Sequence, residues 1–412
     1  MNPDRDGKNL DRYLTAFSDP AGRSTRVDPV KCGTATLCRY VNEFWTARQR
    51  QASRIHEISY RACFKPQLPR FFIDLLTREG DVVYDPFGGR GTTAIEAGLS
   101  GRQVIVNDAN PLSRIITRPR FCPPAVSAVE DRLSHIPLDG GSAEIDLSMF
   151  YHPETEREIV ALRRYLIGRR DAGTVDDIDR WIGMVATSRL TGHSPGFFSV
   201  YTLPPNQAVS PESQRRINLK RGQQPEYRDT HALILRKTKS LLSGLTGQER
   251  ENLVRAGKTA RFFTGDARAT PGIPEDTVRL TVTSPPFLDI VQYRDDNWLR
   301  CWFCGVDEIS LGKTITMART IAVWEAVMGE VFRELFRITE PGGYVAFEVG
   351  EVRKKTVCLE EHVVPLGCDA GFCCEGILIN QQAFTKTSNI WGVGNNSDGT
   401  NSNRIAVFSK PV

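Results

Sequence analysis

Between residues 56 and 120, segments with the hydrophobic spacing of a helix alternate with short apolar runs of strand character. The spacing of apolar residues over 69–77 predicts an amphipathic helix. Short apolar runs at 82–84 and 103–106 are typical of strands, and a helical segment over 92–98 lies between them. A strand, a helix and a strand within so short a stretch predict a βαβ unit, and therefore a parallel sheet.

The pattern changes beyond residue 120. Helical periodicity runs through 156–167 and 177–190, whereas the Pro- and Gln-rich stretch 194–229 is predicted to be irregular. Strand-like runs then resume at 261–264, 278–282, 344–349 and 404–408. An insertion of about 140 residues thus interrupts the sheet, and a segment of that length needs structure of its own.

These patterns divide the chain into three parts. Residues 1–55 are polar and weakly patterned, and we expect them to form an N-terminal arm that is helical in part. Residues 56–120 and 261–412 are expected to share one α/β domain. Residues 121–260 are expected to form an inserted, mainly helical region.

Composition places the chain among ordinary globular proteins. It has 412 residues, of which 40% are hydrophobic and 25% are charged, and this excludes a disordered, collagen-like or disulfide-scaffold protein. No apolar run approaches the ~18 residues that would span a bilayer, and the first residues carry no signal-peptide core. We therefore expect a cytoplasmic protein without a membrane partner.

Charge and cysteines add little by themselves. The formal net charge is only +4, but residues 211–260 hold eleven Lys or Arg against five Asp or Glu. That stretch is suited to phosphate contacts and is equally compatible with a solvated helical face. Of the ten cysteines, Cys301 and Cys304 form a lone CxxC pair, whereas a structural zinc site usually needs two. No metal site is predicted.

The segment Asp85-Pro-Phe-Gly-Gly-Arg-Gly-Thr-Thr93 joins a predicted strand to a predicted helix. Its glycines let the backbone approach a ligand, and the first N–H groups of a helix attract an anionic group. It lacks the lysine of a P-loop, and its glycines do not have the spacing of a dinucleotide fingerprint. Asp85 would repel pyrophosphate but would attract an ammonium, such as that of an amino-acid moiety.

The next predicted strand ends at Asn107-Asp-Ala-Asn-Pro111. An acidic side chain in this place binds the two hydroxyls of a ribose in Rossmann domains. A generic tight turn is the alternative for a glycine-rich loop alone, but the two segments together suggest S-adenosyl-L-methionine as ligand.

The segment Thr283-Ser-Pro-Pro-Phe287 follows the predicted strand 278–282, so it lies at the edge where open α/β sheets bind ligands. Consecutive prolines stiffen the backbone and leave carbonyls without local donors. A serine hydroxyl and a proline carbonyl can accept both hydrogens of an exocyclic amine, and an aromatic ring can stack on a flat base. Since such an amine is buried in a DNA duplex, the base would have to be flipped out.

Together, DPFGGRGTT, NDANP and TSPPF resemble the amino-methyltransferases of DNA, which methylate N4 of cytosine or N6 of adenine. Phe64-Lys-Pro-Gln-Leu68 and Gly265-Asp-Ala267 resemble the family's segments at the methionine and adenine ends of the cofactor. Glu340-Pro-Gly-Gly343 and Gly399-Thr-Asn-Ser-Asn-Arg404 resemble the segments that lead into its later strands.

The resemblance covers residues 56–120 and 261–410 and implies an α/β fold of the Rossmann-like class I methyltransferase type. That fold has a seven-stranded, mostly parallel sheet, here with a largely helical insertion. The resemblance makes the α/β domain a catalytic domain dependent on S-adenosyl-L-methionine. It implies that the following residues bind the cofactor: Lys65, Pro66, Asp85, Phe87, Gly89, Gly91, Thr92, Thr93, Asp108 and Asp266. Within that set, Lys65 and Pro66 would lie at its carboxylate or entrance, Asp108 would bind the ribose and Asp266 the adenine amine.

The same resemblance implies that Ser284, Pro285, Pro286 and Phe287 form the catalytic segment. Hydrogen bonds to Ser284 and to the Pro285 carbonyl would localise the lone pair of the target nitrogen, and Phe287 would stack on the flipped base. Catalysis would rest on positioning and electrostatics, without a covalent intermediate. Methylation at cytosine C5 would need a thiolate, typically in a Pro-Cys dipeptide, and the chain contains none.

The S-P-P-F sequence favours cytosine N4, because the family's adenine enzymes usually carry D-P-P-Y or N-P-P-Y. We therefore expect a site-specific DNA methyltransferase, with N6-adenine specificity as the first alternative. A methyltransferase acting on an RNA base amine would use similar motifs, but no appended RNA-binding domain is recognisable. A DNA-binding protein with a degenerate methyltransferase fold is the alternative that is not an enzyme.

The inserted region is the candidate target-recognition region. Its segments 195–207 and 214–224 are rich in Asn, Gln and Arg, which can read base edges, but wrapping loops have the same composition. Trp298 and Trp302, one helical turn apart, are expected to pack in the core rather than stack on a base.

The expected partner is double-stranded DNA, with a separately encoded cognate restriction endonuclease as a further possibility. The expected setting is the nucleoid of a prokaryote, or a phage. The target sequence, the oligomeric state and a link to restriction stay open at this point.

Overall fold

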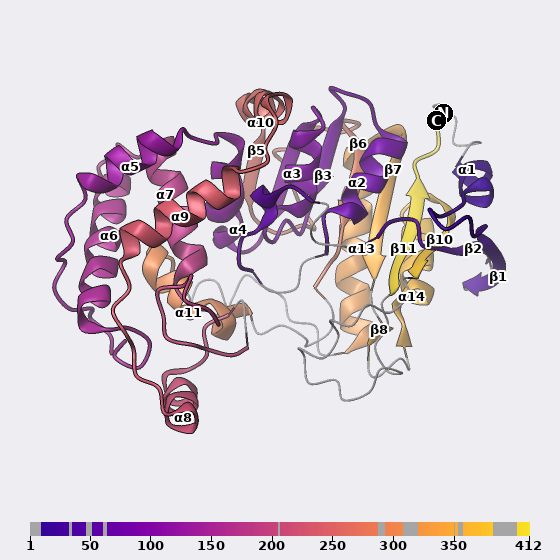
Figure 1. Ribbon diagram of the computed structural model, residues 1–412. Helices are drawn as coiled ribbons and strands as arrows, with labels where there is room; N and C mark the ends of the chain where they lie inside the picture. The colour runs from indigo at the N-terminus through magenta and orange to yellow at the C-terminus, as the bar shows by residue number, and fades with distance from the viewer. Residues whose placement is uncertain are drawn as a thin grey trace.

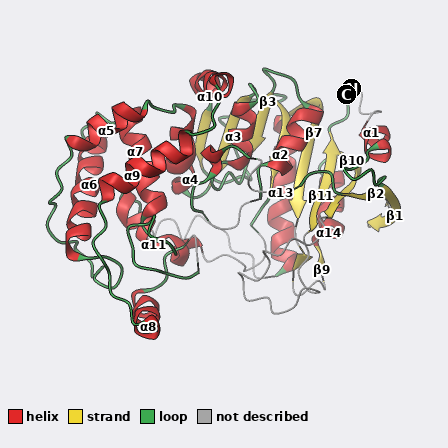
Figure 2. Ribbon diagram, viewed as in Figure 1, coloured by secondary structure: helices red, strands yellow, loops and turns green. Residues whose placement is uncertain are grey.

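A large sheet occupies the right half of the molecule in Figure 1, beside a lobe built almost entirely of helices (Figures 1 and 2). The computed structural model describes residues 10–32, 35–46, 52–60, 64–204, 207–286, 293–307, 320–349, 351–352, 357–381 and 402–412.

The sheet has nine strands. In order across the sheet they are β1 (Arg26–Cys32), β2 (Ala35–Asn42), β10 (Cys373–Gln381), β11 (Ser402–Ser409), β7 (Thr339–Val349), β6 (Val278–Thr283), β3 (Val82–Asp85), β4 (Gln103–Asp108) and β5 (Arg261–Thr264). Every pairing from β7 to β5 is parallel, whereas β11 runs antiparallel to both β7 and β10. The α/β, mostly parallel class predicted from the sequence is therefore confirmed.

The sheet is two strands larger than the seven expected. The hairpin β1–β2 extends it, because β2 pairs in parallel with β10. These strands come from the segment expected to form a partly helical arm, in which only α1 (Leu10–Ala16) is helical for more than one turn among the residues described. Side chains of β1 are largely exposed and Pro29 lies within it, as an edge strand allows. An edge strand has few apolar residues to reveal it, so the hydrophobic pattern did not predict this hairpin.

Helices cover both faces of the sheet. On one face α2 (Gln67–Leu76) and α3 (Thr92–Leu99) pack with Val83 and Val104, and on the other α13 (Ile321–Ile338) and α14 (Leu359–Asp369) pack with Tyr84 and Ile105. Successive strand residues point to opposite faces, so β3 and β4 are apolar on both. The short elements are η2 (Arg54–His56), α4 (Pro111–Thr117), η3 (Arg118–Phe121), β8 (Glu351–Val352) and β9 (Val357–Cys358).

The chain between β4 and β5 forms the helical lobe on the left of Figure 1. Its helices are α5 (Val126–Ser134), α6 (Pro153–Asp171), α7 (Asp177–Arg189), α8 (Pro211–Arg221) and α9 (Thr230–Leu242), whereas α10 (Gly247–Thr259) packs against α3 and β4. Helix α11 (Tyr293–Cys304), which follows the Ser284 segment in sequence, packs against α6 and α7 of this lobe. Helix α8 lies in a stretch predicted to be irregular, because it has no apolar stripe and only Gln214 is buried.

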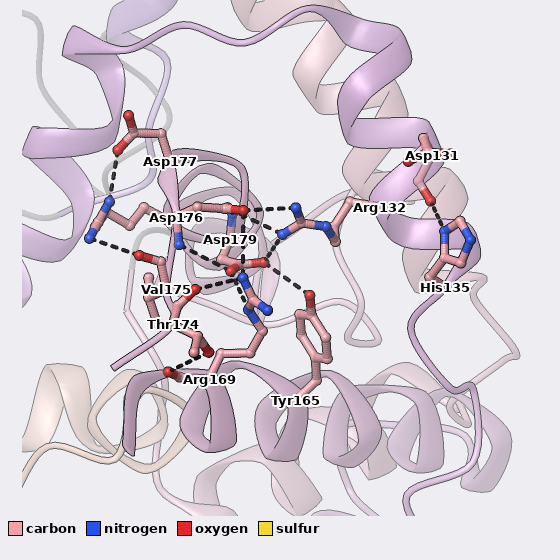
Figure 3. A network of polar contacts seen from close by, with 11 residues as sticks. Asp131, Arg132, His135, Tyr165, Arg169, Thr174, Val175, Asp176, Asp177 and Asp179 are labelled. Atoms are coloured by element: carbon pink, nitrogen blue, oxygen red, sulfur yellow. Dashed lines mark hydrogen bonds and ion pairs between the residues drawn. The ribbon is translucent and has the colours of Figure 1, made fainter. Parts of the chain in front are cut away.

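A network of ion pairs joins three helices of the lobe (Figure 3). Asp179 of α7 accepts hydrogen bonds from Arg132 of α5, from Arg169 Nε at 2.6 Å and from Tyr165 Oη at 3.1 Å. Asp176 caps α7 and pairs with Arg132 at 2.8 Å, which lowers the pKa of Asp176 to about 2. The lobe therefore neutralises its most buried acid with cations of its own.

The two tryptophans of α11 were predicted to pack in the core. Trp298 packs against the core beside Phe150, and Trp302 lies under the guanidinium of Arg163 at 4.9 Å, so the packing role predicted for the tryptophans is confirmed.

Within the described residues, no group of three or more His, Cys, Asp or Glu is arranged to hold a metal ion. None of the described helices has the length and apolar character needed to cross a membrane.

Candidate functional site

The loop between β3 and α3 is shaped by three glycines. Gly89 and Gly91 have positive φ angles of 51° and 74°, and Gly91 caps α3. A Cβ on Gly88 would lie 2.4 Å from Val106, and a Cβ on Gly91 would lie 2.3 Å from Thr117. One side of the loop therefore packs closely against Val106 and Thr117. The N–H groups of the loop and Asp85 form the other side.

Asp85 ends β3 and is 1% exposed. Its Oδ1 accepts a hydrogen bond from Thr283 Oγ1 at 2.7 Å and from the Phe87 amide at 3.1 Å. Its Oδ2 is buried and has no hydrogen-bond partner among the residues described. Burial raises the pKa of Asp85 to about 7 in spite of these bonds. A buried carboxylate oxygen without a donor fits a cationic ligand group, such as the ammonium that the sequence predicted.

Asp108 ends β4, the neighbouring strand, so the two acids lie at the same edge of the sheet. It accepts backbone hydrogen bonds from Gly89 at 2.7 Å and from Asn110 at 2.8 Å, and burial raises its pKa to about 6. Each carboxylate oxygen has a second lone pair, so Asp108 retains acceptor capacity for hydroxyl groups.

The Ser284 segment is fastened to the glycine loop by two side chains. Thr283 donates to Asp85, and Thr93 Oγ1 of α3 donates to the Val282 carbonyl at 2.9 Å. The sequence motifs are 198 positions apart at Asp85 and Thr283, and parallel pairing of β3 with β6 brings them together. The structure therefore places the predicted cofactor loop and the predicted catalytic segment in one site.

Glu348 is a member of this site that the sequence analysis did not identify. It lies near the end of β7, is 8% exposed, and accepts a hydrogen bond from Asn403 Nδ2 at 2.5 Å; the side chain of Ser284 lies near enough to favour its ionised form. Burial raises its pKa to about 7. The signal in the sequence is one acidic residue in the apolar run 344–349, where a buried strand has no structural use for a charge.

Trp324 is a second residue that the motifs did not reveal. Its indole Nε1 donates to the Pro286 carbonyl at 3.0 Å from α13. This bond fixes the segment after Ser284, and it leaves the Pro285 carbonyl as the neighbouring acceptor. Pro285 is buried and Pro286 half-buried. Phe287 lies outside the described residues.

The Phe64-Lys65-Pro66 segment is held beside the glycine loop. The Phe64 carbonyl accepts from Arg90 Nη2 at 3.3 Å, and the Arg90 carbonyl accepts from the buried Arg120. Lys65 is exposed and Pro66 is buried at the start of α2. The segment thus touches the loop through the Phe64 carbonyl, and the cofactor contacts of Lys65 and Pro66 stay predictions.

Asp266 follows β5 at the same edge of the sheet, but its carboxylate is engaged. Arg268 Nε lies 3.0 Å from one oxygen and 2.9 Å from the other, and Arg268 Nη2 lies 2.6 Å from the second. The pairing lowers the pKa of Asp266. A ligand amine would have to share this carboxylate with Arg268, and the adenine contact stays a prediction.

Residues 9–115 match the N6/N4 methyltransferase family model, whose description is DNA methylase. The match includes the glycine loop and Asp108 and ends before the Ser284 segment. It confirms the family resemblance drawn from the motifs and does not distinguish N4 from N6 enzymes. No curated protein matches the chain.

Solved structures give weaker likenesses. A candidate DNA modification methylase from Thermus thermophilus, solved with S-adenosyl-L-methionine, is 23% identical, with 36% of this chain and 54% of that chain covered and a TM-score of 0.24. A TehB-like S-adenosylmethionine-dependent methyltransferase from Corynebacterium glutamicum is 9% identical over 83% of this chain and 86% of that one, with a TM-score of 0.30. This chain thus spans about half the length of the Thermus protein, and likenesses of this degree add nothing to what its own strand order shows.

Proposed function

We propose that this chain, which carries the match to the DNA methylase family, is a site-specific DNA methyltransferase that methylates the exocyclic N4 of a flipped cytosine. The observation that carries the proposal is the junction at Thr283, which joins the unsatisfied Asp85 of the glycine loop to Ser284 of the catalytic segment. A cation site and an amine-binding site then share one edge of the sheet, as a group transfer between two ligands requires.

S-adenosyl-L-methionine is the cofactor that this site fits. The residues that would hold it are the glycine loop, with Asp85 for the ammonium, Asp108 for the ribose hydroxyls, and Asp266 and Lys65 at its two ends. When bound, it supplies a methyl group on a positively charged sulfur. Because Asp85 provides a buried negative charge with a free oxygen, it would select a ligand with a cationic amino-acid end.

Glu348 gives Ser284 its role as an acceptor. A hydroxyl that donates its hydrogen to Glu348 keeps its lone pairs for the N–H groups of a base. The Pro285 carbonyl accepts the second N–H, while Trp324 holds the adjacent carbonyl of Pro286. The target nitrogen would then keep its lone pair out of the ring and available to the methyl group that the cofactor would supply, and the proton lost from the amine on methylation would pass to solvent.

The first experiment is base analysis by mass spectrometry. The protein is incubated with S-adenosyl-L-methionine and unmodified double-stranded DNA, and the DNA is digested to nucleosides. N4-methylcytosine supports the proposal, whereas N6-methyladenine keeps the reaction but overturns the interpretation of Ser284. If the cofactor binds and no methylated base forms, double-stranded DNA alone is not sufficient for the reaction. Calorimetry with the cofactor measures its binding separately, and absence of cofactor binding overturns the proposal that the chain is a methyltransferase.

Two variants test the roles of individual side chains. Ser284→Ala removes the acceptor hydroxyl and is expected to lower kcat by about 100-fold or more without weakening cofactor binding. Glu348→Gln can donate to Ser284 and so turn its hydroxyl away from the base, which is expected to lower kcat by about 10-fold to 100-fold. If Glu348→Gln leaves kcat unchanged, the carboxylate does not orient Ser284.

A further inference from the structure

Helix α8 projects from the end of the helical lobe, away from the rest of the molecule (Figure 1). Its start and end are set by the Ser210 cap, Pro211 at the first position and Gly222 in the left-handed conformation. The side chains at Glu212, Arg215, Arg216, Leu219 and Lys220 are all exposed. Spacings of three and four place these five on one outward face.

The opposite face is bound to the lobe by amides. Gln214 Nε2 donates to the Tyr201 carbonyl at 3.0 Å, and Asn218 Nδ2 donates to the Met149 carbonyl at 2.8 Å. Gln223 Nε2, just after the helix, also donates to Tyr201, at 2.9 Å. The sequence suggested that amides of this stretch read base edges, but these three hold the helix in place. The outward charges therefore remain as the groups available to a partner.

The outward face carries three cations against one acid, Glu212, and includes one apolar side chain. Within the described residues, Arg216 hydrogen-bonds to Ser213 at 3.5 Å and forms no ion pair within 4 Å, although its charge acts on Glu212 one turn away. Lys220 forms no ion pair there either, whereas Arg215 pairs with Asp146 at 2.6 Å. Leu219 between them is 86% exposed. Exposing Leu219 among cations that repel one another does not stabilise the protein by itself. Double-stranded DNA offers phosphates to the cations and apolar base edges to the leucine.

The position of α8 agrees with the geometry of the candidate site. The arrow of β7 points downward in Figure 1, and α8 hangs from the lobe on that same side. Ser284 follows β6, which runs parallel to β7, so the catalytic segment faces the same way. A helix is about 10–12 Å across with its side chains, so α8 fits the ~12 Å major groove of duplex DNA, and its eleven residues would extend about 16 Å.

We propose that the outward face of α8 docks on double-stranded DNA, with Arg216 and Lys220 at phosphates and Leu219 against base edges. The proposal rests on the proposed function, because it names the element of the helical insertion that holds the substrate. The hydrogen bonds from the side-chain amides to the carbonyls of Tyr201 and Met149 hold the helix in place. Its DNA-contacting face is therefore preorganised rather than formed on binding.

The test measures binding of the full-length protein to a fluorescein-labelled 30-base-pair duplex of mixed sequence, by anisotropy at several salt concentrations. Arg216→Ala and Lys220→Ala are each expected to weaken binding about threefold to tenfold at low salt and to reduce the salt slope by about one. Leu219→Ser is expected to weaken binding without changing that slope, because no charge is lost. Exposed positions of this kind leave the thermal unfolding temperature unchanged, which is checked for each variant.

Lys258→Ala and Val254→Ala on α10 are the matched controls. Both side chains are exposed, and α10 lies on the opposite side of the molecule from α8 in Figure 1. Each control is expected to bind the duplex as the unmodified protein does. Equal losses for the α8 variants and these controls would overturn the proposal.

Two further outcomes separate this proposal from the proposed function. If the α8 variants weaken duplex binding but the unmodified protein yields no methylated base, the docking helix stands and the methyltransferase activity falls. If a single-stranded RNA of equal length binds tightly through Arg216 and Lys220 while the duplex does not, α8 has a different partner and the docking proposal is wrong.

Discussion

Asp179 in the helical lobe and Asp85 in the sheet are each 1% exposed, yet their surroundings differ in kind. Asp179 receives hydrogen bonds from two arginines and a tyrosine (Figure 3). Asp85 receives only neutral donors, a hydroxyl and a backbone amide, and keeps one oxygen without a partner. A buried charge without a counter-charge is costly in a folded protein.

The difference separates an acid neutralised within the protein from an acid whose second oxygen has no hydrogen-bond partner among the described residues. The lobe supplies the cations for its acid and is complete by itself, so its network stabilises the packing of α5, α6 and α7. At the sheet edge, burial raises the pKa of Asp85 and Glu348 to about 7 each and of Asp108 to about 6, and none of the three forms an ion pair within the part of the chain that the structure describes. Groups held in this state are common where a ligand completes the site.

The largest expected effect is on stability in the lobe. Asp179→Asn removes the buried charge that Arg132 and Arg169 share and leaves them only the partly exposed Asp176, so we expect a loss of about 3–5 kcal/mol in the free energy of unfolding. Urea denaturation followed by circular dichroism measures it. Asp176→Asn, at a side chain that is 42% exposed, is the control and should cost less. A loss below about 1 kcal/mol for Asp179→Asn would show that the network does not hold the lobe.

The corresponding change in the sheet should affect binding rather than folding. Asp85→Asn removes a charge that the apo protein does not neutralise, so the free energy of unfolding should stay the same or rise. Affinity for S-adenosyl-L-methionine should fall about 100-fold, as the loss of a buried charge-assisted bond implies. Isothermal titration calorimetry tests this, with the exposed Asp74→Asn as control. Unchanged affinity in Asp85→Asn would rule out the ammonium contact.

The pH dependence should have opposite signs in the two halves. The folded pKa of Asp85, about 7, is above its usual value of 3.8, so the folded state binds more protons between these values and its stability falls as pH rises from about 4 to 7. The pKa of Asp176 is lowered to about 2, so its contribution is present above about 4 and is lost as pH falls toward 2.

Unfolding curves from pH 2 to pH 8 test these signs, and Asp85→Asn should flatten the slope between pH 4 and 7. Cofactor affinity should fall by about tenfold per pH unit below 7, because binding requires the ionised Asp85. Cofactor affinity that is constant from pH 5 to 8 would contradict the assignment.

The smallest effect is expected at an exposed pair. Arg70 and Asp74 on α2 lie 2.8 Å apart but are 46% and 52% exposed, so Asp74→Ala should cost no more than about 0.5 kcal/mol. Urea denaturation at low and high salt measures the change. A cost as large as that of Asp179→Asn would mean that burial is not what distinguishes the two kinds of acid.

Local pattern was sufficient for much of the fold. The short apolar runs became β3, β4 and β6, and the segments with helical periodicity became α2, α6 and α7, with ends shifted by a few residues. The hairpin β1–β2 and the strand β10 were not predicted, because their burial depends on neighbours that are distant in sequence. Helix α8 was not predicted either, since amides rather than an apolar stripe bind it to the lobe.

The sequence alone determined the chemistry of the two motifs. Glycines, Asp85 and the Ser284-Pro-Pro segment are local in sequence, and their residue types indicate what each can bind. Only the tertiary structure decided that Asp85 and Thr283 meet, that Glu348 and Trp324 lie beside the Ser284 segment, and that Arg268 pairs with Asp266. The physical reason is that hydrogen bonds and desolvation depend on distances in space, and parallel pairing of strands brings together residues that the sequence separates by hundreds of positions.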